Sequence, residues 1–510
     1  MTVFTQRQYL GIERERSGQA QRANVSSPFG VLNTREAESA MEATDAPIMV
    51  NWFPSQGKVT TRKGFTEYAT GLTGNVETLA EFNAGSIRKF ICANSDEIND
   101  VTNPLSISNL GNGFTNARWQ TANFNGNMLL VNGADTPQVY DGSTLSNSTI
   151  SGSGLTVTEL DGVNIHKNRV YAWSTDSQDF WYGATNAIGG TFTKFPLSRV
   201  AASGGNLIAM ATWNHDGGDG VDDYALFVMS SGVCVLYHGS DPGDATNWSL
   251  VGIFKIGSPL SVRGIAKVGG DVAIITTQDF IFFSKVFQAG GNKINDTKLS
   301  GAAIDDINAY QSNYGWEIAT YPKASIGGWL LFNVPVATNT TYNQYVINTV
   351  TGAATKFSGM NARTWGLYND SLYFGESTKI MKADDGLSDN GEFIVCDVQA
   401  AYSDLGTPQE KVINSYRNVI SVDGNVALNT TTSFDYGQNK VTQDVSSVSS
   451  GTPWGSPWGS PWSPANRIRN ELVIGSGEGV AIGMRIKVSL SGQQLDWYRT
   501  DYSVNINNIL

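Results

Sequence analysis

The chain has 510 residues, of which 16% are charged and 40% hydrophobic, and it carries a formal net charge of −12. This length is typical of two to four domains or of one long, repeat-built β body. The acidic balance argues against nonspecific nucleic-acid binding through a basic face, and no apolar run approaches the ~18 residues of a membrane-spanning helix.

The N-terminal region, residues 1–50, is predicted to be an arm with one short helix. Residues 1–30 are polar and mixed in charge, without the apolar core and cleavage site of a signal peptide. The segment from Thr34 to about Ala43 favours a helix, because Asn33 can cap it and Glu36 follows three residues later. Its apolar stripe is small, so we expect the helix to dock on the body without forming a core.

Between residues 51 and 390 a tight turn, a β-rich apolar run and a second turn recur. The seven instances begin at Gly85, Asn125, Asn168, Asp222, Gly270, Gly327 and Asp370. By this numbering they lie 40 to 57 residues apart, and about 40–50 residues is the length of a four-stranded propeller blade. The sequence therefore predicts a mostly β fold with a β-propeller body of six or seven blades. A pair of β-sandwiches with similarly spaced hairpins is the alternative.

A C-terminal β-rich domain is predicted for residues 391–510, after a hinge at residues 384–391. From Val480 to Leu490 apolar and polar residues alternate, which indicates a strand with one buried face and with Arg485 and Lys487 on the other. We expect these two side chains to lie on a solvated face, with contact to an acidic neighbour or to a passing phosphate as the alternative.

A loop rich in tryptophan and proline occupies residues 452–464. Trp454, Trp458 and Trp462 recur at intervals of four, with a proline before each. The prolines exclude an inner strand. Three tryptophan side chains are costly to leave in water, so they are expected to pack against a neighbouring subunit or, alternatively, against their own domain.

The sequence offers no catalytic, cofactor-binding or metal-binding constellation. Cys92, Cys234 and Cys396 are far apart and odd in number, which indicates buried free thiols. The three histidines share no ligand spacing, and the acidic loop at residues 215–223 is open to two interpretations, a calcium site or a solvated loop. We expect that the protein is not an enzyme and binds no cofactor.

Several segments resemble one family. The segment 236–277 is similar to the hallmark segment of the tail nozzle, or packaged-DNA stabilisation, proteins of short-tailed double-stranded DNA bacteriophages. The segment 45–65 resembles the family's N-terminal motif through Asn51, Phe53, Pro54, Gly57, Arg62 and Gly64. Further similarity lies in residues 180–195, 394–436 and 479–502, so the resemblance covers nearly all of the chain after residue 30.

This resemblance implies a structural virion protein of the phage tail, located in the virion. Its members would form a hexameric ring below the portal and adaptor, contact tail fibres or spikes, retain packaged DNA and form the conduit for its ejection. Double-stranded DNA would pass through the lumen without sequence-specific binding. The alternative is a glycan-binding or glycan-cleaving propeller that attaches the particle to its host, with the tryptophan loop as a sugar-stacking surface.

Overall fold

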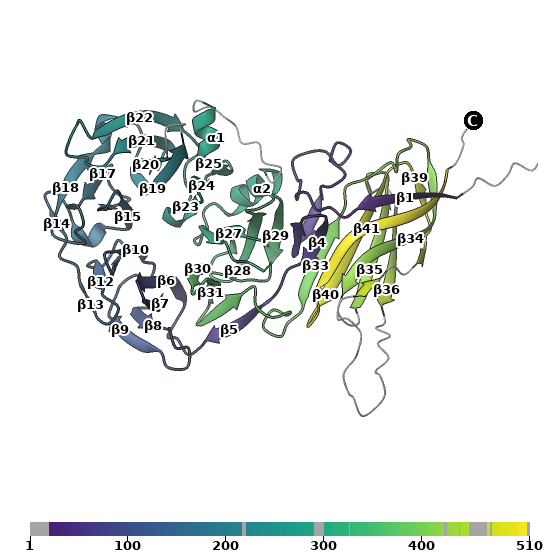
Figure 1. Cartoon of the computed structure of the whole chain (residues 1–510), viewed down its shortest axis with the longest axis horizontal. Coiled ribbons are helices and arrows are strands. Elements are labelled where there is room, and N and C mark those ends of the chain that lie inside the picture. The colour runs from purple at the N-terminus through teal and green to yellow at the C-terminus, as the bar shows by residue number, and fades with distance from the viewer. Residues whose placement is uncertain are drawn as a thin grey trace, which may run out of the picture.

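The computed structural model describes residues 20–216, 221–289, 300–325, 327–422, 426–437, 439–447, 467–469 and 472–506. These residues form two bodies side by side, a ring of radial β-sheets and a β-sandwich (Figure 1). The ring extends from β5 (Phe65–Ala69) to β32 (Lys379–Ala383). The strands before and after it build the sandwich.

The ring is a β-propeller, and the described residues form seven blades. The first blade consists of β6 (Val76–Ala84), β7 (Ile87–Asn94), β8 (Glu97–Asp100) and β9 (Ser108–Asn112), and the second of β10 (Gln120–Phe124), β11 (Asn127–Val131), β12 (Gln138–Tyr140) and β13 (Leu145–Asn147). The third blade consists of β15 (Gly162–His166), β16 (Arg169–Trp173), β17 (Asp179–Tyr182) and β18 (Thr191–Pro196), with β14 (Ser151–Gly152) beside β18. The fourth consists of β19 (Leu207–Asp216), β20 (Val221–Met229), β21 (Val233–Gly239) and β22 (Trp248–Lys255). The fifth blade consists of β23 (Ile265–Val268), β24 (Asp271–Ile275) and β25 (Phe280–Phe282). The sixth consists of β26 (Glu317–Tyr321), β27 (Trp329–Ala337), β28 (Thr341–Asn348) and β29 (Ala354–Ser358). The seventh consists of β30 (Thr364–Tyr368), β31 (Ser371–Glu376) and β32, together with β5.

Six of these blades are separate sheets, and the seventh, β26–β29, belongs to a larger sheet of nine strands. The inner strands β6, β10, β15, β19, β23, β26 and β30 contact one another in turn around the axis. The ring closes where β5, from the N-terminal side, pairs with β32 of the last blade. The prediction of a propeller with six or seven blades is confirmed.

The seven recurring sequence elements are the second strands of the blades, β7, β11, β16, β20, β24, β27 and β31. These strands are continuous apolar runs because neighbouring blades cover both of their faces; β11 and β24, for example, are buried from the second residue onward. The turn before β11 needs left-handed backbone, and Asn125 and Gly126 supply it with φ of 49° and 74°.

The sandwich packs an eight-stranded sheet on one half of the nine-stranded sheet. The eight strands are β1 (Gln21–Ser26), β3 (Trp52–Ser55), β4 (Lys58–Thr61), β34 (Lys411–Val422), β37 (Arg467–Arg469), β38 (Val473–Ile474), β39 (Glu478–Gly479) and β41 (Leu495–Ile506). The opposing half consists of β2 (Ile48–Val50), β33 (Ile394–Gln399), β40 (Ile482–Leu490), β35 (Val426–Phe434) and β36 (Asn439–Ser447). Buried side chains such as Tyr416, Ile486 and Trp497 form the core between them.

The predicted domain boundary at residue 51 is wrong, and the predicted boundary at residue 391 falls between β32 and β33. Strands β3 and β4, assigned to the propeller from the sequence, pair with each other and then with β41 of the sandwich. The β3–β4 hairpin turns back at Gly57, whose φ is 75°, so that β4 pairs with the distant strand β41 and Trp52 is buried in the sandwich core. The propeller begins only after residue 62.

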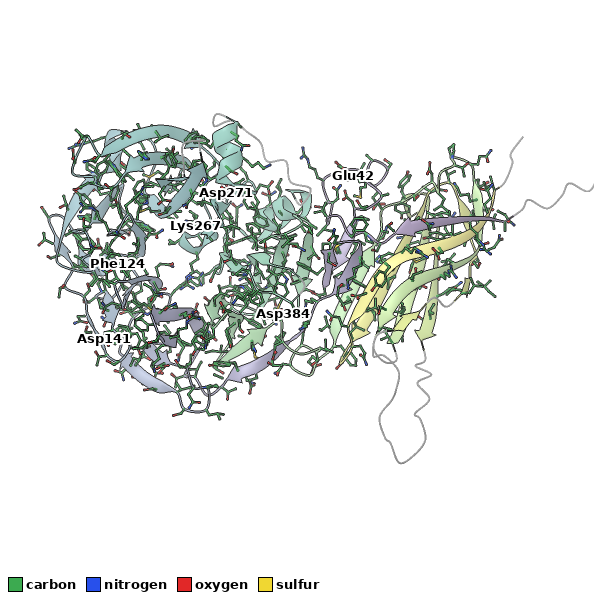
Figure 2. All side chains as sticks on the ribbon, viewed as in Figure 1. Glu42, Phe124, Asp141, Lys267, Asp271 and Asp384 are labelled. Atoms are coloured by element: carbon green, nitrogen blue, oxygen red, sulfur yellow. The ribbon has the colours of Figure 1, made fainter. Side chains whose placement is uncertain are left out.

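The predicted helix at residues 34–43 is absent, and this segment forms turns and bends. Asn33 Oδ1 does accept hydrogen bonds from the backbone amides of Arg35 and Glu36, at 3.3 and 3.2 Å. No helix follows this cap because Ala37 and Ala40 are exposed and leave no apolar face to bury. Glu42, near the end of the same loop, is also exposed (Figure 2).

Helices in the described part of the chain are short. They are α1 (Phe283–Gln288) and α2 (Ser300–Tyr310), with 3₁₀ turns η1 (Val157–Glu159), η2 (Leu197–Arg199), η3 (Val262–Gly264) and η4 (Asp435–Gly437). α1 buries Phe283 and Val286 next to β24, and α2 buries Ala303 and Ile307 against β27. Among the described residues, no helix has the length and apolar character needed to cross a bilayer.

The propeller and the sandwich share a backbone hydrogen-bond network. β2 pairs in parallel with β29 of the sixth blade on one side and antiparallel with β33 of the sandwich on the other. One hydrophobic core follows this sheet, from Phe280 and Phe332 in the propeller to Cys396 and Ile486 in the sandwich. The two bodies are therefore joined by paired strands and not only by connecting chain.

A buried ion pair closes the junction at which the chain crosses between the bodies. Arg62 and Asp389 form a two-pronged pair with distances of 2.8 Å and 2.7 Å. The other Arg62 donors reach Asn51 Oδ1 at 2.9 Å and the carbonyls of Lys63 and Ser358 at 3.0 and 2.8 Å. All five guanidinium N–H groups are thus used, and the Arg62 side chain is completely buried.

The two crossing segments also touch through their backbones. A Cβ on Gly64 would lie 1.8 Å from the carbonyl oxygen of Ser388, so only glycine fits there. Phe65 N–H donates to the carbonyl of Ser388, and Asn390 N–H donates to the carbonyl of Phe65. The segment predicted to be a hinge is therefore held in place by the junction.

Replacing Arg62 with Met should destabilise the protein strongly, because Asp389 would be left buried without its counter-ion. Breaking such a pair costs about 3–5 kcal/mol, and thermal unfolding would report it as a lower Tm. The double variant R62M/D389L should recover much of the loss, since both charges are then gone.

A matched control is K379M, which removes an exposed pair with Glu67 at 2.6 Å and should cost less than about 1 kcal/mol. Equal Tm values for R62M and K379M would contradict a locked junction.

Candidate functional site

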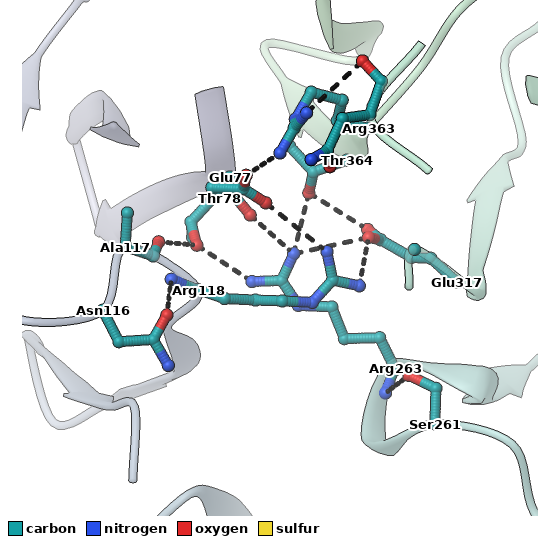
Figure 3. Close-up of polar contacts among 12 residues, drawn as sticks. Glu77, Thr78, Asn116, Ala117, Arg118, Ser261, Arg263, Glu317, Arg363 and Thr364 are labelled. Atoms are coloured by element: carbon teal, nitrogen blue, oxygen red, sulfur yellow. Dashed lines mark hydrogen bonds and ion pairs between the residues drawn. The ribbon is translucent and has the colours of Figure 1, made fainter. Parts of the chain in front are cut away.

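Five charged residues gather at the axis of the propeller. Glu77 and Glu317 lie at the starts of the inner strands β6 and β26, and Arg363 directly precedes β30. Arg118 lies two residues before β10, and Arg263 lies in η3, ahead of β23. Because inner strands contact one another around the axis, side chains at their first residues converge there (Figure 3).

Arg263 is the centre of this axial cluster. Its guanidinium donates to Thr364 Oγ1 at 2.8 Å, Thr78 Oγ1 at 2.9 Å, the carbonyls of Glu77 at 2.9 Å and Trp119 at 2.6 Å, and Glu317 Oε2 at 3.3 Å. Its acceptors come from or directly before β6, β10, β26 and β30, so one side chain of the fifth blade connects to four others (Figure 3).

The remaining charges complete the cluster. Arg118 forms ion pairs with Glu317 at 3.4 Å and Glu77 at 3.9 Å, and Arg363 pairs with Glu77. Three guanidiniums face two carboxylates, which leaves a formal charge of +1. Burial lowers the pKa of Arg263, and the Arg118 charge lowers it further, while Glu317 raises it. Arginine nevertheless stays protonated, so the cluster is a fixed set of charges.

A polar hollow of about 320 Å³ adjoins the axial cluster. Tyr314 lies at its edge, half exposed, with the guanidinium of Arg118 4.7 Å from its ring centre. The other polar lining residues are Asn116, Gln120, Asn132, Asp161, Ser261 and Asn313. Amides, a hydroxyl and an aromatic ring suit hydrogen bonding and stacking, and the described residues include no group of three or more metal-ligating side chains.

Arg485 and Lys487 lie on β40, and both are engaged within the chain. Arg485 forms a two-pronged pair with Asp397 on the neighbouring strand β33, at 2.8 and 2.6 Å, and Lys487 approaches the same carboxylate at 3.5 Å. The predicted alternation of burial holds from Met484 to Leu490, whereas Gly483 is buried like its two neighbours. Val480 precedes the strand and is 39% exposed. The alternative, a contact of these two side chains with a neighbouring subunit or with phosphates, remains a prediction.

Other residues considered from the sequence fall into two groups. Cys92, Cys234 and Cys396 are free and buried, as predicted, and burial raises the pKa of each thiol. Trp454, Trp458 and Trp462, and the side chains of His215, Asp216, Asp219 and Asp222, lie outside the described residues. Their expected roles in subunit contact and calcium binding therefore remain predictions.

His166 is a buried neutral side chain at the end of β15. Its Nε2 lies 3.2 Å from the carbonyl of Gly239, which can only accept, so Nε2 carries the hydrogen. Nδ1 lies 3.1 Å from the hydroxyl of Thr212. Burial lowers the pKa of His166 from 6.5 to about 4, and the bond to Gly239 opposes the shift.

The axial cluster and the junction were not predicted as sites. Any two of Arg118, Arg263 and Arg363 are at least a hundred residues apart, and nothing near them in sequence marks them. The one available signal is positional, because each arginine stands just before the inner strand that precedes one of the recurring sequence elements.

Comparisons with known proteins find no matching family model and no matching curated protein. Among solved structures, YCF48 from Cyanidioschyzon merolae is similar at 8% identity and a TM-score of 0.38, over 63% of this chain and 98% of its own. Raptor from Chaetomium thermophilum has 9% identity and a TM-score of 0.39, over 64% of this chain and 29% of its own. BBS1N in complex with ARL6DN has 10% identity and a TM-score of 0.41, over 64% of this chain and 100% of its own. The assignment of a propeller rests on the strand pairing described above.

Replacing Arg263 with Met should destabilise the propeller, because the buried acceptors of Glu77, Trp119 and Thr364 would lose their donor. Each buried acceptor left unsatisfied costs about 1–3 kcal/mol, and the total would be measured as a fall in Tm. R88M is the control, because the Arg88 side chain is 43% exposed and its ion pair with Glu81, at 3.6 Å, is a loose surface contact. A Tm for R263M equal to that of R88M would show that the axial cluster does not hold the ring together.

His166 should make stability depend on pH. The folded-state pKa is lowered, so the unfolded state binds more protons, and stability is lost as pH falls from about 6.5 towards 4. Within that window His166 contributes up to about 1.4 kcal/mol per pH unit. The variant H166Q should therefore show a flatter fall in unfolding free energy between pH 7 and 5, measured in urea at each pH. An unchanged slope would contradict this assignment.

Proposed function

We propose that this chain is a structural virion protein of a short phage tail, a subunit of a nozzle or tail-tube ring attached below the portal and adaptor. In this role it would retain packaged DNA and form the conduit for DNA ejection. The resemblance of residues 45–65 and 236–277 to the nozzle family motivates the proposal. The first segment supplies Asn51, Arg62 and Gly64 to the junction, and the second supplies Arg263 to the axial cluster.

The observation that carries the proposal is the joining of propeller and sandwich through one sheet and one buried ion pair. A conduit for packaged DNA transmits force through its subunits, and separate domains on a flexible linker would yield under it. Paired strands from β29 through β2 to β33 resist such separation. The Arg62–Asp389 pair adds a connection between the crossing segments.

A hexameric ring requires two different contact faces on each subunit. Candidates in the described residues include the edge strand β22, where Leu250, Val251 and Ile253 are exposed, and the sandwich surface at Phe393 and Val395. Exposed apolar side chains on an unpaired edge strand favour protein contact. The partners in this proposal are further copies of the chain, the adaptor, tail fibres or spikes, and the DNA duplex within the lumen.

A second candidate function is glycan binding, or glycan cleavage, by a host-attachment propeller. The polar hollow beside Tyr314 favours it, because an aromatic ring among amide side chains suits a sugar. An array of purified glycans tests this candidate: specific retention that is lost in Y314A would support it, whereas the nozzle proposal expects no specific retention.

Electron microscopy of purified virions, with antibody labelling of this chain, tests the nozzle proposal. Labelled annular density with sixfold symmetry at the distal tail is the expected result. Absence of the chain from virions, or label on radiating appendages, would overturn the proposal and favour host attachment.

A further inference from the structure

A hollow of about 440 Å³ lies on the outer face of the eight-stranded sheet, across β1, β41 and β34. Three arginines line it, Arg22 from β1, Arg417 from β34 and Arg499 from β41, with a single carboxylate, Asp501. All four side chains face away from the sandwich core, because the alternate residues of these strands, such as Tyr416 and Tyr502, are buried in it.

The strand register brings these groups together. Asp501 lies opposite Arg417 on one side and Asn24 on the other, and Ser503 lies opposite Arg22 and Ser415. Two cross-strand rows therefore place guanidinium, hydroxyl and amide donors on one solvent-facing surface. Together they form the basic hollow, defined by Arg22, Asn24, Ser415, Arg417, Arg499, Asp501 and Ser503.

Asp501 orients two of the arginines and leaves most of their donors available. Nε of Arg417 donates to one carboxylate oxygen at 2.8 Å and Nε of Arg499 to the other at 2.9 Å. Both contacts use only Nε, so four terminal amino groups have no acceptor among the described residues. The two side chains are 43% and 52% exposed, and no ion pair involves Arg22 within the described part of the chain.

Asp501 remains ionised in this setting. Partial burial would raise its pKa, but hydrogen bonds from Arg417 and Arg499 outweigh burial and hold the pKa below its ordinary value. Three positive charges thus face one permanent negative charge. The local excess is +2 on a chain whose net charge is −12.

This donor set matches phosphate oxygens. Arginine presents a planar fork of N–H groups that binds phosphate in two-pronged fashion, and hydroxyl and amide groups complete the coordination. β1 and β34 lie two strand intervals apart, or about 10 Å, which exceeds the width of a single anion. A nucleic-acid backbone, with one phosphate per about 3.4 Å along each strand, fits a surface of that width.

We propose that the basic hollow binds the phosphate backbone of double-stranded DNA. The proposal deepens the proposed function and rests on it for the source of the phosphates, the duplex inside the conduit. At physiological salt, charges further away than about 8–10 Å are largely screened. The three arginines can therefore attract phosphates although the chain as a whole is acidic. Three phosphate contacts give a weak, strongly salt-dependent grip, suited to guiding a duplex without arresting it.

Fluorescence anisotropy of the full chain with a labelled 20-base-pair duplex, between 20 and 200 mM NaCl, tests the site. Neutralising three phosphates predicts a slope of about −2.7 for log K against log salt. R417Q/R499Q should lower the magnitude of that slope by about 1.8 and weaken binding at least tenfold at 20 mM. R22Q, which leaves the Asp501 contacts intact, should lower it by about 0.9.

The charge-matched control is R88Q/R199Q, two exposed arginines of the propeller, which should retain the full slope. Binding by R417Q/R499Q equal to that of the control would overturn the site. Displacement of the duplex by poly-glutamate as readily as by unlabelled DNA would also overturn it, since the hollow would then be a carboxylate-binding protein interface.

The DNA-binding experiment tests the basic hollow, and virion labelling tests the proposed function, so the two can fail independently. Loss of DNA binding in R417Q/R499Q, with no label in the tail, would leave the site standing and overturn the proposed function. Label at the tail, together with DNA binding that R417Q/R499Q leaves unchanged, would support the proposed function and overturn the site.

Discussion

The structure depends on how the buried Arg62–Asp389 pair is satisfied. A buried ion pair stabilises a fold only when every donor and acceptor is used, because desolvation of both charges is costly. Arg62 meets that condition with all five donors, and its partner Asp389 lies 327 residues away in sequence. The pair therefore specifies where the chain leaves the sandwich for the propeller and where it returns, which in turn lets β5 complete the last blade.

The axial cluster applies the same principle at the centre of the ring. Blades contact only their neighbours, so a ring of sheets has few interactions across its axis. Arg263 provides them, because it bonds to groups on four other blades and is buried among them. The nine-stranded sheet then carries this fixed ring into the sandwich through β2. Ring closure, ring axis and sandwich are thus mechanically linked.

The sequence was informative wherever local patterning decides structure. The second strand of every blade could be found from the sequence. A turn with Asn, Gly or Asp followed by an apolar run forms a strand that is buried between neighbouring sheets. Local signals failed where tertiary contacts decide: Asn33 caps a segment that has no apolar face and forms no helix. The β3–β4 hairpin joins the sandwich because of pairing with β41, more than 400 residues away. The axial and junction clusters likewise assemble from distant residues.

Net charge describes this protein poorly because its arginines are divided between two kinds of environment. Four arginines are buried, with at most 9% of each side chain exposed, and form ion pairs with internal carboxylates: Arg62, Arg118, Arg263 and Arg363. Carboxylates elsewhere give the chain its acidic total, which disfavours a general grip on nucleic acid. The surface of the eight-stranded sheet departs from that total, because Arg22, Arg417 and Arg499 share only Asp501. Under the proposed function, such a protein would repel DNA over most of its surface and contact it at one face, so that a duplex could be positioned and still move.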